Sequence, residues 1–204
     1  MTHKDYAESM LKVLSVLNTA ASILLLALVI FRTATADDVV FEAPLSFKGT
    51  GCPGEVSVAV VGAGTPTLSV LFGRFDSGES SVSGLFRTAC SFAIPVKVIR
   101  GFQVSHITVD WEGYVEGEGE LKRKLFLAGH DWIPWQINSF NEPDGENFTI
   151  RDNLLHASFA VGCDGAEYNL RINSQIIASE ASYIAVDSAD LNNKVTFKIK
   201  FEEC

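Results

Sequence analysis

The chain has 204 residues, 47% of them hydrophobic, and a formal net charge of −9 at pH 7. Nucleic acids and anionic membrane surfaces attract basic proteins, so this acidic composition argues against both as partners. The length is sufficient for one domain with a sizeable core.

The first 36 residues are typical of a cleavable secretory signal peptide, which is itself predicted to be helical. A polar start with two lysines precedes a largely apolar run over residues 13–31. Small residues at Ala34 and Ala36 satisfy the cleavage rule, which predicts Asp37 as the first mature residue. The alternative is an uncleaved membrane anchor, because a bilayer is crossed by roughly 20 apolar residues. In either case residues 37–204 are predicted to face the extracellular side.

The remaining part of the chain, residues 37–204, shows the pattern of β-strands almost throughout. Short runs alternate apolar and polar residues, and clusters of Gly, Pro, Asn and Asp separate them, which is typical of half-buried antiparallel strands. About nine to eleven short strands in a single domain predict an all-β fold, either an antiparallel β-sandwich or a flattened barrel. In chain order the predicted strands cover residues 39–42, 45–48, 56–60, 68–72, 90–94, 96–99, 102–111, 148–150, 157–161, 168–173 and 195–201.

The last of these runs has the clearest alternation. Apolar residues at the odd positions from 195 to 201 are predicted to face the core, whereas Lys198 and Lys200 face solvent. The most polar stretches, residues 76–83 and residues 138–147, are predicted to be surface loops.

Four cysteines follow the signal peptide, at Cys52, Cys90, Cys163 and Cys204. An even number of cysteines in an exported chain predicts two structural disulfides. Three pairings are possible, and spacing alone does not choose among them. The chain has no Cys-x-x-Cys pair, which argues against a redox or zinc-binding role.

A series of short motifs follows a fixed order along the mature chain, beginning with Gly-Cys-Pro at residues 51–53. The later motifs lie at residues 68–75, 87–92, 101–104, 111–115, 170–173 and 186–188, and the series closes with the terminal cysteine.

This series resembles the family called domain of unknown function 4360, a family of small secreted proteins. The resemblance implies a secreted, β-rich domain and implies no reaction. Together with the sequential order of the cysteine-bounded blocks, it predicts that Cys52 pairs with Cys90 and Cys163 with Cys204.

Five acidic residues share one parity and would point to one face of an extended strand. One interpretation is a cation site, most readily for Ca²⁺, which prefers several hard oxygen ligands. A second interpretation is a pair of carboxylates for glycoside hydrolysis. The residues of this acidic stripe are Asp110, Glu112, Glu116, Glu118 and Glu120.

The competing interpretation makes the acidic stripe the solvated face of a hairpin. Gly117 and Gly119 would then lie in the turn, and the basic residues at 122–124 would offset the charge. No calcium-loop spacing of the Asp-x-Asp-x-Asp-Gly kind is present, and no other cofactor is predicted.

The segment at residues 130–136 carries two tryptophans three positions apart. Trp132 and Trp135 could form an aromatic platform for a sugar ring, with Asp131 or Gln136 hydrogen-bonding its hydroxyl groups. The alternative is a core plug that caps one end of the sandwich, because tryptophan usually buries most of its ring.

No other pattern points to catalysis. His106, His130 and His156 lack the close spacing of metal ligands, and there is no Gly-x-Ser-x-Gly nucleophile motif. Residues 147–149 form an Asn-Phe-Thr glycosylation sequon. We therefore predict a secreted, non-catalytic binding or surface-interaction module for carbohydrate or another cell-surface component. The alternatives are a small secreted hydrolase that uses the acidic stripe, and a purely structural extracellular protein.

Overall fold

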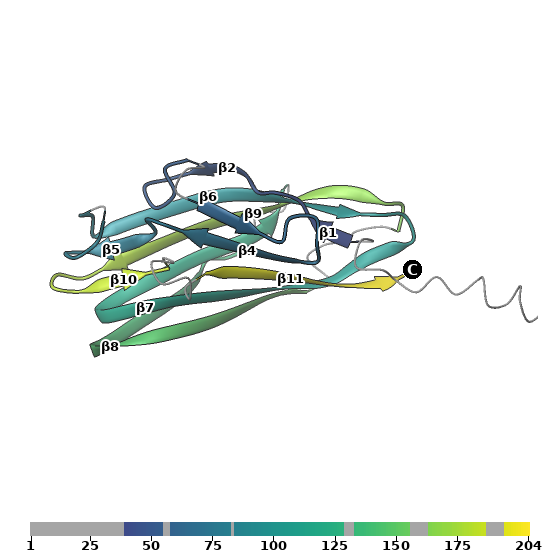
Figure 1. Cartoon of the computed structure of the whole chain (residues 1–204). Helices are drawn as coiled ribbons and strands as arrows, with labels where there is room; N and C mark the ends of the chain where they lie inside the picture. Colours follow the sequence, from purple (N-terminus) through teal and green to yellow (C-terminus); the bar gives the residue numbers. More distant parts are fainter. Residues whose placement is uncertain (1–38, 55–57, 83, 129–132, 156–162, 187–193) are drawn as a thin grey trace, which may run out of the picture. The chain divides into compact units, whose positions relative to one another are not determined.

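Eleven β-strands and no helix make up the part of the chain that the structure describes (Figure 1). The computed structural model describes residues 39–54, 58–82, 84–128, 133–155, 163–186 and 194–204. The predicted all-β class is confirmed, whereas the predicted signal peptide and the strand predicted at residues 157–161 lie outside the described residues. The strands are β1 (Val39–Phe41), β2 (Leu45–Lys48), β3 (Val58–Val61), β4 (Thr67–Phe72), β5 (Asp76–Gly78), β6 (Arg87–Val98), β7 (Phe102–Leu127), β8 (Gln136–Leu155), β9 (Ala166–Ala178), β10 (Tyr183–Ala185) and β11 (Val195–Glu203).

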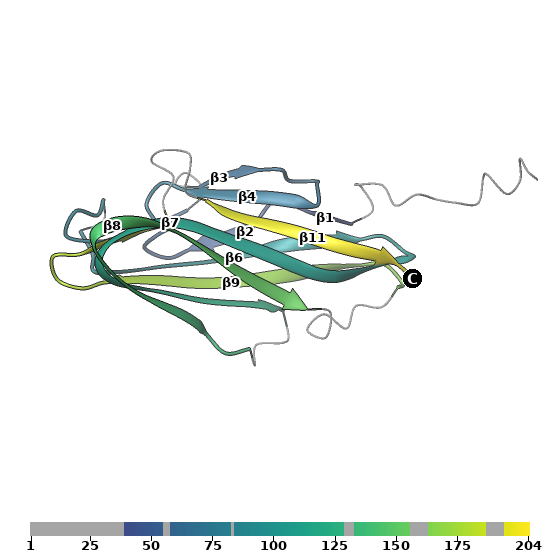
Figure 2. The same ribbon diagram turned by 90° about the horizontal axis from the view of Figure 1, so that it is seen from below.

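The strands form one antiparallel sheet that curls into a sandwich around β7. The hydrogen-bonded order is β1–β6–β9–β7–β11–β4–β3. One edge of β7 pairs with β8, and the other edge pairs first with β11, then with β10 and finally with β9. The first half of β7 therefore belongs to the layer of β11, β4 and β3, and the second half belongs to the layer of β9 and β6. Figure 2 shows β7 and β8 bending together at one end of the sandwich.

Aromatic side chains fill the space between the two layers. The ring of Phe197 on β11 lies edge-on to Phe41 of β1 and to Phe92 of β6, with centroids 6.0 and 6.3 Å apart. Such pairs add about 0.5–1.5 kcal/mol beyond the gain from burial. The predicted alternation in the last strand is confirmed, because Val195, Phe197 and Ile199 are buried and the two lysines are exposed.

The prediction of a hairpin turn at Gly117 and Gly119 is wrong, because both glycines lie inside the 26-residue strand β7. Gly117 sits at a bulge with a φ of +80°, where a Cβ atom would come within 2.3 Å of the Ser182 hydroxyl. Glycine at this position permits the close approach of Ser182. The chain stays extended and forms no turn, because β8 and β10 pair with β7 on its two edges.

Of the two stretches predicted as loops, residues 138–147 and the first three residues of 76–83 belong to strands, whereas residues 79–82 form a turn as predicted. Residues 138–147 lie within β8. The strand contains a bulge, at which residues 143–145 of β8 are opposed to the single residue Glu116 of β7. Their polarity reflects the position of β8, which pairs only with β7 in the described structure and exposes many of its side chains. In the other stretch, residues 76–78 form the buried strand β5, paired with β10.

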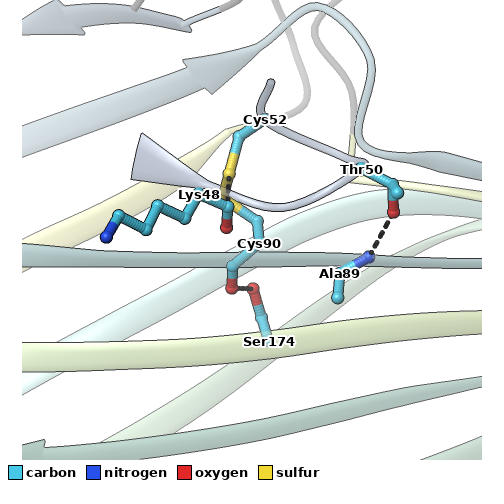
Figure 3. The surroundings of a disulfide bond; sticks show 6 residues. All are labelled: Lys48, Thr50, Cys52, Ala89, Cys90 and Ser174. Carbon is cyan, nitrogen blue, oxygen red and sulfur yellow. Dashed lines mark hydrogen bonds between the residues drawn. A yellow bond between two sulfur atoms is a disulfide. The ribbon is translucent and has the colours of Figure 1, made fainter. Parts of the chain in front are cut away.

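Both predicted disulfides are confirmed. Cys52 is bonded to Cys90 with 5.4 Å between Cα atoms, and Cys163 is bonded to Cys204 with 6.0 Å. Figure 3 shows how the first bond holds the segment after β2 against β6. Gly49 is required there, because a Cβ atom would lie 2.1 Å from the carbonyl oxygen of Ala89. The Gly-rich opening motif therefore allows this segment to lie directly on the sheet.

Both disulfides fit an oxidising, extracellular compartment. The part of the chain that the structure describes contains no apolar helix of the length that crossing a bilayer requires.

Candidate functional site

The bend in the β7–β8 hairpin brings the two ends of β8 to the same side of the sandwich. Between them lies an open cleft of about 450 Å³, within the range typical of small-molecule sites. Its lining comes from the end of β7, from the segment before β8, and from both ends of β8. The lining residues are Leu125, Ile133, Pro134, Gln136, Arg151, Asp152, Asn153 and Leu154.

A buried ion pair joins the two layers beside this cleft. Arg123 donates from Nε and Nη2 to the two carboxylate oxygens of Asp152, over 2.7 and 2.9 Å. The indole Nε1 of Trp111 donates to the same carboxylate over 3.0 Å. The side chains of Arg123 and Asp152 are only 3% and 11% exposed. Because the charge of Asp152 is balanced and hydrogen-bonded, its burial is tolerated.

A second charge cluster lies on the outer face of β7, opposite the face that carries the pair of Arg123 and Asp152. Arg151 of β8 donates from Nε and Nη2 to the carboxylate of Asp110, over 2.6 and 3.1 Å. Lys198 of β11 donates to the same carboxylate over 3.1 Å. These bonds, above all those from Arg151, hold the pKa of Asp110 below its usual value. The carboxylate in turn raises the pKa of the Arg151 guanidinium.

The predicted sugar-binding residues are placed in part. Gln136 lines the cleft, whereas Asp131 and Trp132 lie outside the described residues. Trp135 follows the lining residue Pro134 directly, and 47% of its surface is exposed. The core-plug alternative therefore does not hold for Trp135. Of the tryptophans that the structure describes, Trp111 is the fully buried one.

The acidic stripe follows one face of β7, as the parity predicted, but its members are not gathered around a common point. Asp110 is bound by Arg151 and Lys198, Glu120 contacts Lys122 at 2.9 Å, and the carboxylate of Glu112 lies 3.9 Å from Lys194. Among the described residues, no group of three or more His, Cys, Asp and Glu side chains is arranged to hold a metal ion.

The far end of the acidic stripe borders a second hollow. Glu118 and Glu120 line it together with Ser139 and Asn141 of β8 and with Ser179, which directly follows β9, and its volume is about 470 Å³. Glu116 is exposed on the same strand. The calcium site remains a prediction.

Sequence reasoning missed the two buried charges beside the cleft. The basic residues at 122–124 were expected to offset the acidic stripe together, but Arg123 points inward, while Lys122 contacts Glu120. The alternation of side chains along the two strands could have predicted that both residues face inward. Arg123 lies between Leu121 and Leu125 on the apolar face of β7, and Asp152 shares its parity with apolar neighbours on β8.

The family comparison gives a match over most of the chain. A family model described as "Domain of unknown function (DUF4360)" matches residues 43–204, as the motif series predicted. No curated protein matches this chain in sequence.

Several solved structures share a distant likeness. A carbohydrate-binding module specific for non-crystalline cellulose, CBM28, is 14% identical, with 71% of this chain and 79% of that one covered and a TM-score of 0.32. The module CBM6cm-2 from Cellvibrio mixtus lichenase 5A, in complex with cellotriose, is 11% identical, with 80% and 98% covered and a TM-score of 0.30. TmCBM61, in complex with β-1,4-galactotriose, is 10% identical, with 78% and 88% covered and a TM-score of 0.26.

Proposed function

The chain belongs to the family described as domain of unknown function (DUF4360), and we propose that it is a secreted, non-catalytic module that binds carbohydrate at the cleft between the two ends of β8. The observation that carries this proposal is the exposed indole of Trp135, which stands in the sequence between two lining residues, Pro134 and Gln136, although it is not itself part of the lining. An exposed tryptophan is costly in water and offers a flat apolar face to a sugar ring.

The polar groups of the cleft suit a polyhydroxylated ligand. Gln136 offers an amide oxygen that accepts and an amide nitrogen that donates hydrogen bonds, and Asn153, whose Oδ1 accepts from the Thr108 hydroxyl over 3.2 Å, adds an amide nitrogen. Leu125, Leu154 and Pro134 supply apolar surface beside them. Apolar walls with a few oriented polar groups are the usual composition of a small-molecule site.

A buried ion pair braces the frame of the cleft. The bidentate bond between Arg123 and Asp152 ties the two layers together directly beside the lining. Groups held in place before binding lose little conformational entropy when a ligand arrives, and this favours affinity.

The two alternatives differ in the support that they have. A hydrolase would need a carboxyl group with a raised pKa as its general acid, whereas the most buried acid of the stripe, Asp110, has a lowered one. A structural extracellular role is favoured by one observation. In the described structure β8 pairs only along its β7 edge, which leaves its other edge open to another strand.

A glycan array probed with the disulfide-bonded protein tests the proposal. We expect binding to one class of polysaccharide, with loss of most of the signal on Trp135→Ala. Phe86→Ala is the matched control, because Phe86 is 44% exposed and neither lines the cleft nor adjoins a lining residue in the sequence. Both variants should unfold within about 1 kcal/mol of the parent, as exposed positions generally do. Equal binding by parent and Trp135→Ala would contradict the proposal, and so would concentration-dependent self-association without glycan binding.

A further inference from the structure

The one glycosylation sequon of the sequence lies on β8. Asn147, Phe148 and Thr149 are the only residues of the chain that follow the pattern Asn-x-Ser/Thr. Such a motif accepts an N-linked glycan in proteins that pass through the secretory pathway, where it must lie on the surface. The two disulfides fit an oxidising compartment of that kind. Whether the fold can carry a glycan then depends on where the side chain of Asn147 lies.

The middle residue of the sequon fixes the direction of the other two. The ring of Phe148 lies over Gly113 of β7, where a Cβ atom would come within 2.3 Å of it. The same ring is 4.7 Å from that of Phe140 between centroids, and both rings pack against the core. Successive side chains of a strand point to opposite faces. Asn147 and Thr149 therefore face away from the core, and both are exposed.

The cross-strand partners give the same orientation. Asn147 is directly opposed to Tyr114 of β7, and Thr149 is directly opposed to Glu112. Directly opposed residues of an antiparallel pair lie on one face of the sheet. The side chain of Tyr114 reaches across to the bulge of β8, because a Cβ atom on Gly145 would lie 2.0 Å from its hydroxyl oxygen. A sugar linked to Asn147 would thus have an aromatic ring beside it, which suits the apolar face of a pyranose.

A glycan on Asn147 would leave the cleft open. The β8 residues that line the cleft are Gln136 at one end of the strand and residues 151–154 at the other. Asn147 precedes the nearest of them by four residues, and an extended strand spans about 13 Å over that length. Its side chain also points to the outer face of the hairpin. The N-linked glycan and a ligand in the cleft would therefore occupy different surfaces.

The position of Asn147 also bears on the open edge of β8. An unpaired edge strand can add a further strand, and proteins protect such edges with charge, proline, bulges or a cover. The bulge of β8 contains Pro143 and lies between Glu142 and Glu146, so the middle of the strand has three of these protections. Residues 147–150, which follow the bulge, have neither charge nor proline. A glycan on the first of them would supply the cover.

We propose that Asn147 is the acceptor of an N-linked glycan, and that this glycan shields residues 147–150 of β8 from the addition of another strand. In the transfer, the amide nitrogen Nδ2 of Asn147 forms a bond to C1 of the first sugar of a lipid diphosphate-linked oligosaccharide. The bond from C1 to the diphosphate oxygen breaks, and the lipid diphosphate leaves with the bonding electron pair. Nδ2 loses one proton, and nothing is oxidised or reduced.

Production of the full chain in yeast tests the acceptor site. A host leader placed before Met1 directs the chain into the secretory pathway, and the mass of the product is measured before and after treatment with peptide N-glycosidase. We expect a higher mass that the enzyme removes. Peptide mapping should then find aspartate in place of the glycosylated asparagine at position 147. Asn141, which is exposed on the same strand and has no sequon, should remain unchanged.

Two substitutions at one exposed position provide the matched controls. Thr149→Ala removes the sequon and should abolish the mass difference, whereas Thr149→Ser keeps the sequon and should preserve it. The absence of free thiols in both products shows that the two disulfides have formed. A parent chain that carries no glycan overturns the acceptor site, and so does a mass difference that persists in Thr149→Ala.

Sedimentation over a range of protein concentrations tests the shielding. We expect Thr149→Ala, which lacks the glycan, to self-associate at lower concentration than the parent and Thr149→Ser. Thr149→Lys also lacks the glycan but places a charge on the same stretch of the edge, so it should stay monomeric with the parent. Equal association of Thr149→Ala and the parent overturns the shielding and leaves the acceptor site intact. Equal association of Thr149→Ala and Thr149→Lys also overturns it, because the contact would then lie elsewhere on the molecule.

Discussion

Arg123 on the second half of β7 and Asp152 near the end of β8 form a bidentate ion pair across the sandwich, with N···O distances of 2.7 and 2.9 Å. The two residues belong to the same hairpin, but neither is the other's cross-strand partner. Arg123 pairs in register with Gln136, and Asp152 pairs with Val109. Their contact is therefore possible only because the hairpin bends, and it lies directly beside the cleft.

Replacing Arg123 should destabilise the protein strongly. Arg123→Met leaves the nearly buried carboxylate of Asp152 without its cation, and breaking a buried pair in this way costs about 3–5 kcal/mol. Urea unfolding measures this loss. Lys122→Met is the matched control on the neighbouring residue, because it breaks only the exposed pair with Glu120, which should contribute at most about 1 kcal/mol. Similar losses in both variants would contradict the buried role of Arg123.

The two disulfides should differ in their reactivity. They close loops of nearly equal length, with sequence separations of 38 and 41 residues, so loop entropy assigns each about 4 kcal/mol. Cys52 and Cys90 are fully buried, whereas Cys204 is exposed. Limited reduction followed by alkylation and peptide mapping should label Cys163 and Cys204 first, because exchange requires access to the sulfur. Earlier labelling of Cys52 would show that the segment after β2 opens more readily than the chain end.

Removing both cysteines of each pair should distinguish the stability that comes from core packing from the stability that comes from loop entropy. The Cys52→Ala/Cys90→Ala variant loses core contacts as well as the cross-link, so it should be less stable than Cys163→Ala/Cys204→Ala. Thermal unfolding of the two double variants tests this order. Equal melting temperatures would mean that burial of the first bond adds little.

The stabilising contribution of Asp110 should depend on pH. Its folded-state pKa is lowered, so its contribution is present above the unfolded pKa of about 4 and is lost as the pH falls through the folded value. Asp110→Asn should therefore be destabilising at pH 7, and the difference from the parent should shrink below about pH 4.

Urea unfolding across this pH range checks the prediction. Glu112→Gln is the control, because Glu112 and Lys194 are 3.9 Å apart and both are partly exposed, and such pairs contribute little. A loss from Asp110→Asn that stays constant with pH would show that the carboxylate acts through shape and not through charge.

Millimolar Ca²⁺ should leave the melting temperature nearly unchanged. Three members of the acidic stripe already have cationic partners, and a specifically bound ion would raise the melting temperature by mass action. Differential scanning calorimetry with Ca²⁺ and with EDTA measures the effect. A rise of several degrees that disappears in Glu116→Gln/Glu118→Gln would establish the calcium site instead.

The sequence by itself determined the strand class, the direction of many side chains and the covalent links. Period-two alternation is a local property of an extended chain, so the inward face of Val195, Phe197 and Ile199 could be read without knowing the neighbouring strands. The disulfide pairing was predicted from the order of the cysteines together with the resemblance to the family, and it is confirmed. Glycine signals misled the prediction at Gly117, because a glycine that admits a neighbouring side chain and a glycine in a turn have the same local pattern.

Only the tertiary structure decided that the two ends of β8 meet. The contact between Arg123 and Asp152, the sharing of Asp110 by Arg151 and Lys198, and the cleft between Gln136 and Asn153 all depend on where β7 passes from one layer to the other. That crossing is set by pairing with β11, β10 and β9 in turn, segments that are distant in sequence. Pairing between distant segments depends on the packing of the whole core, which local alternation does not encode.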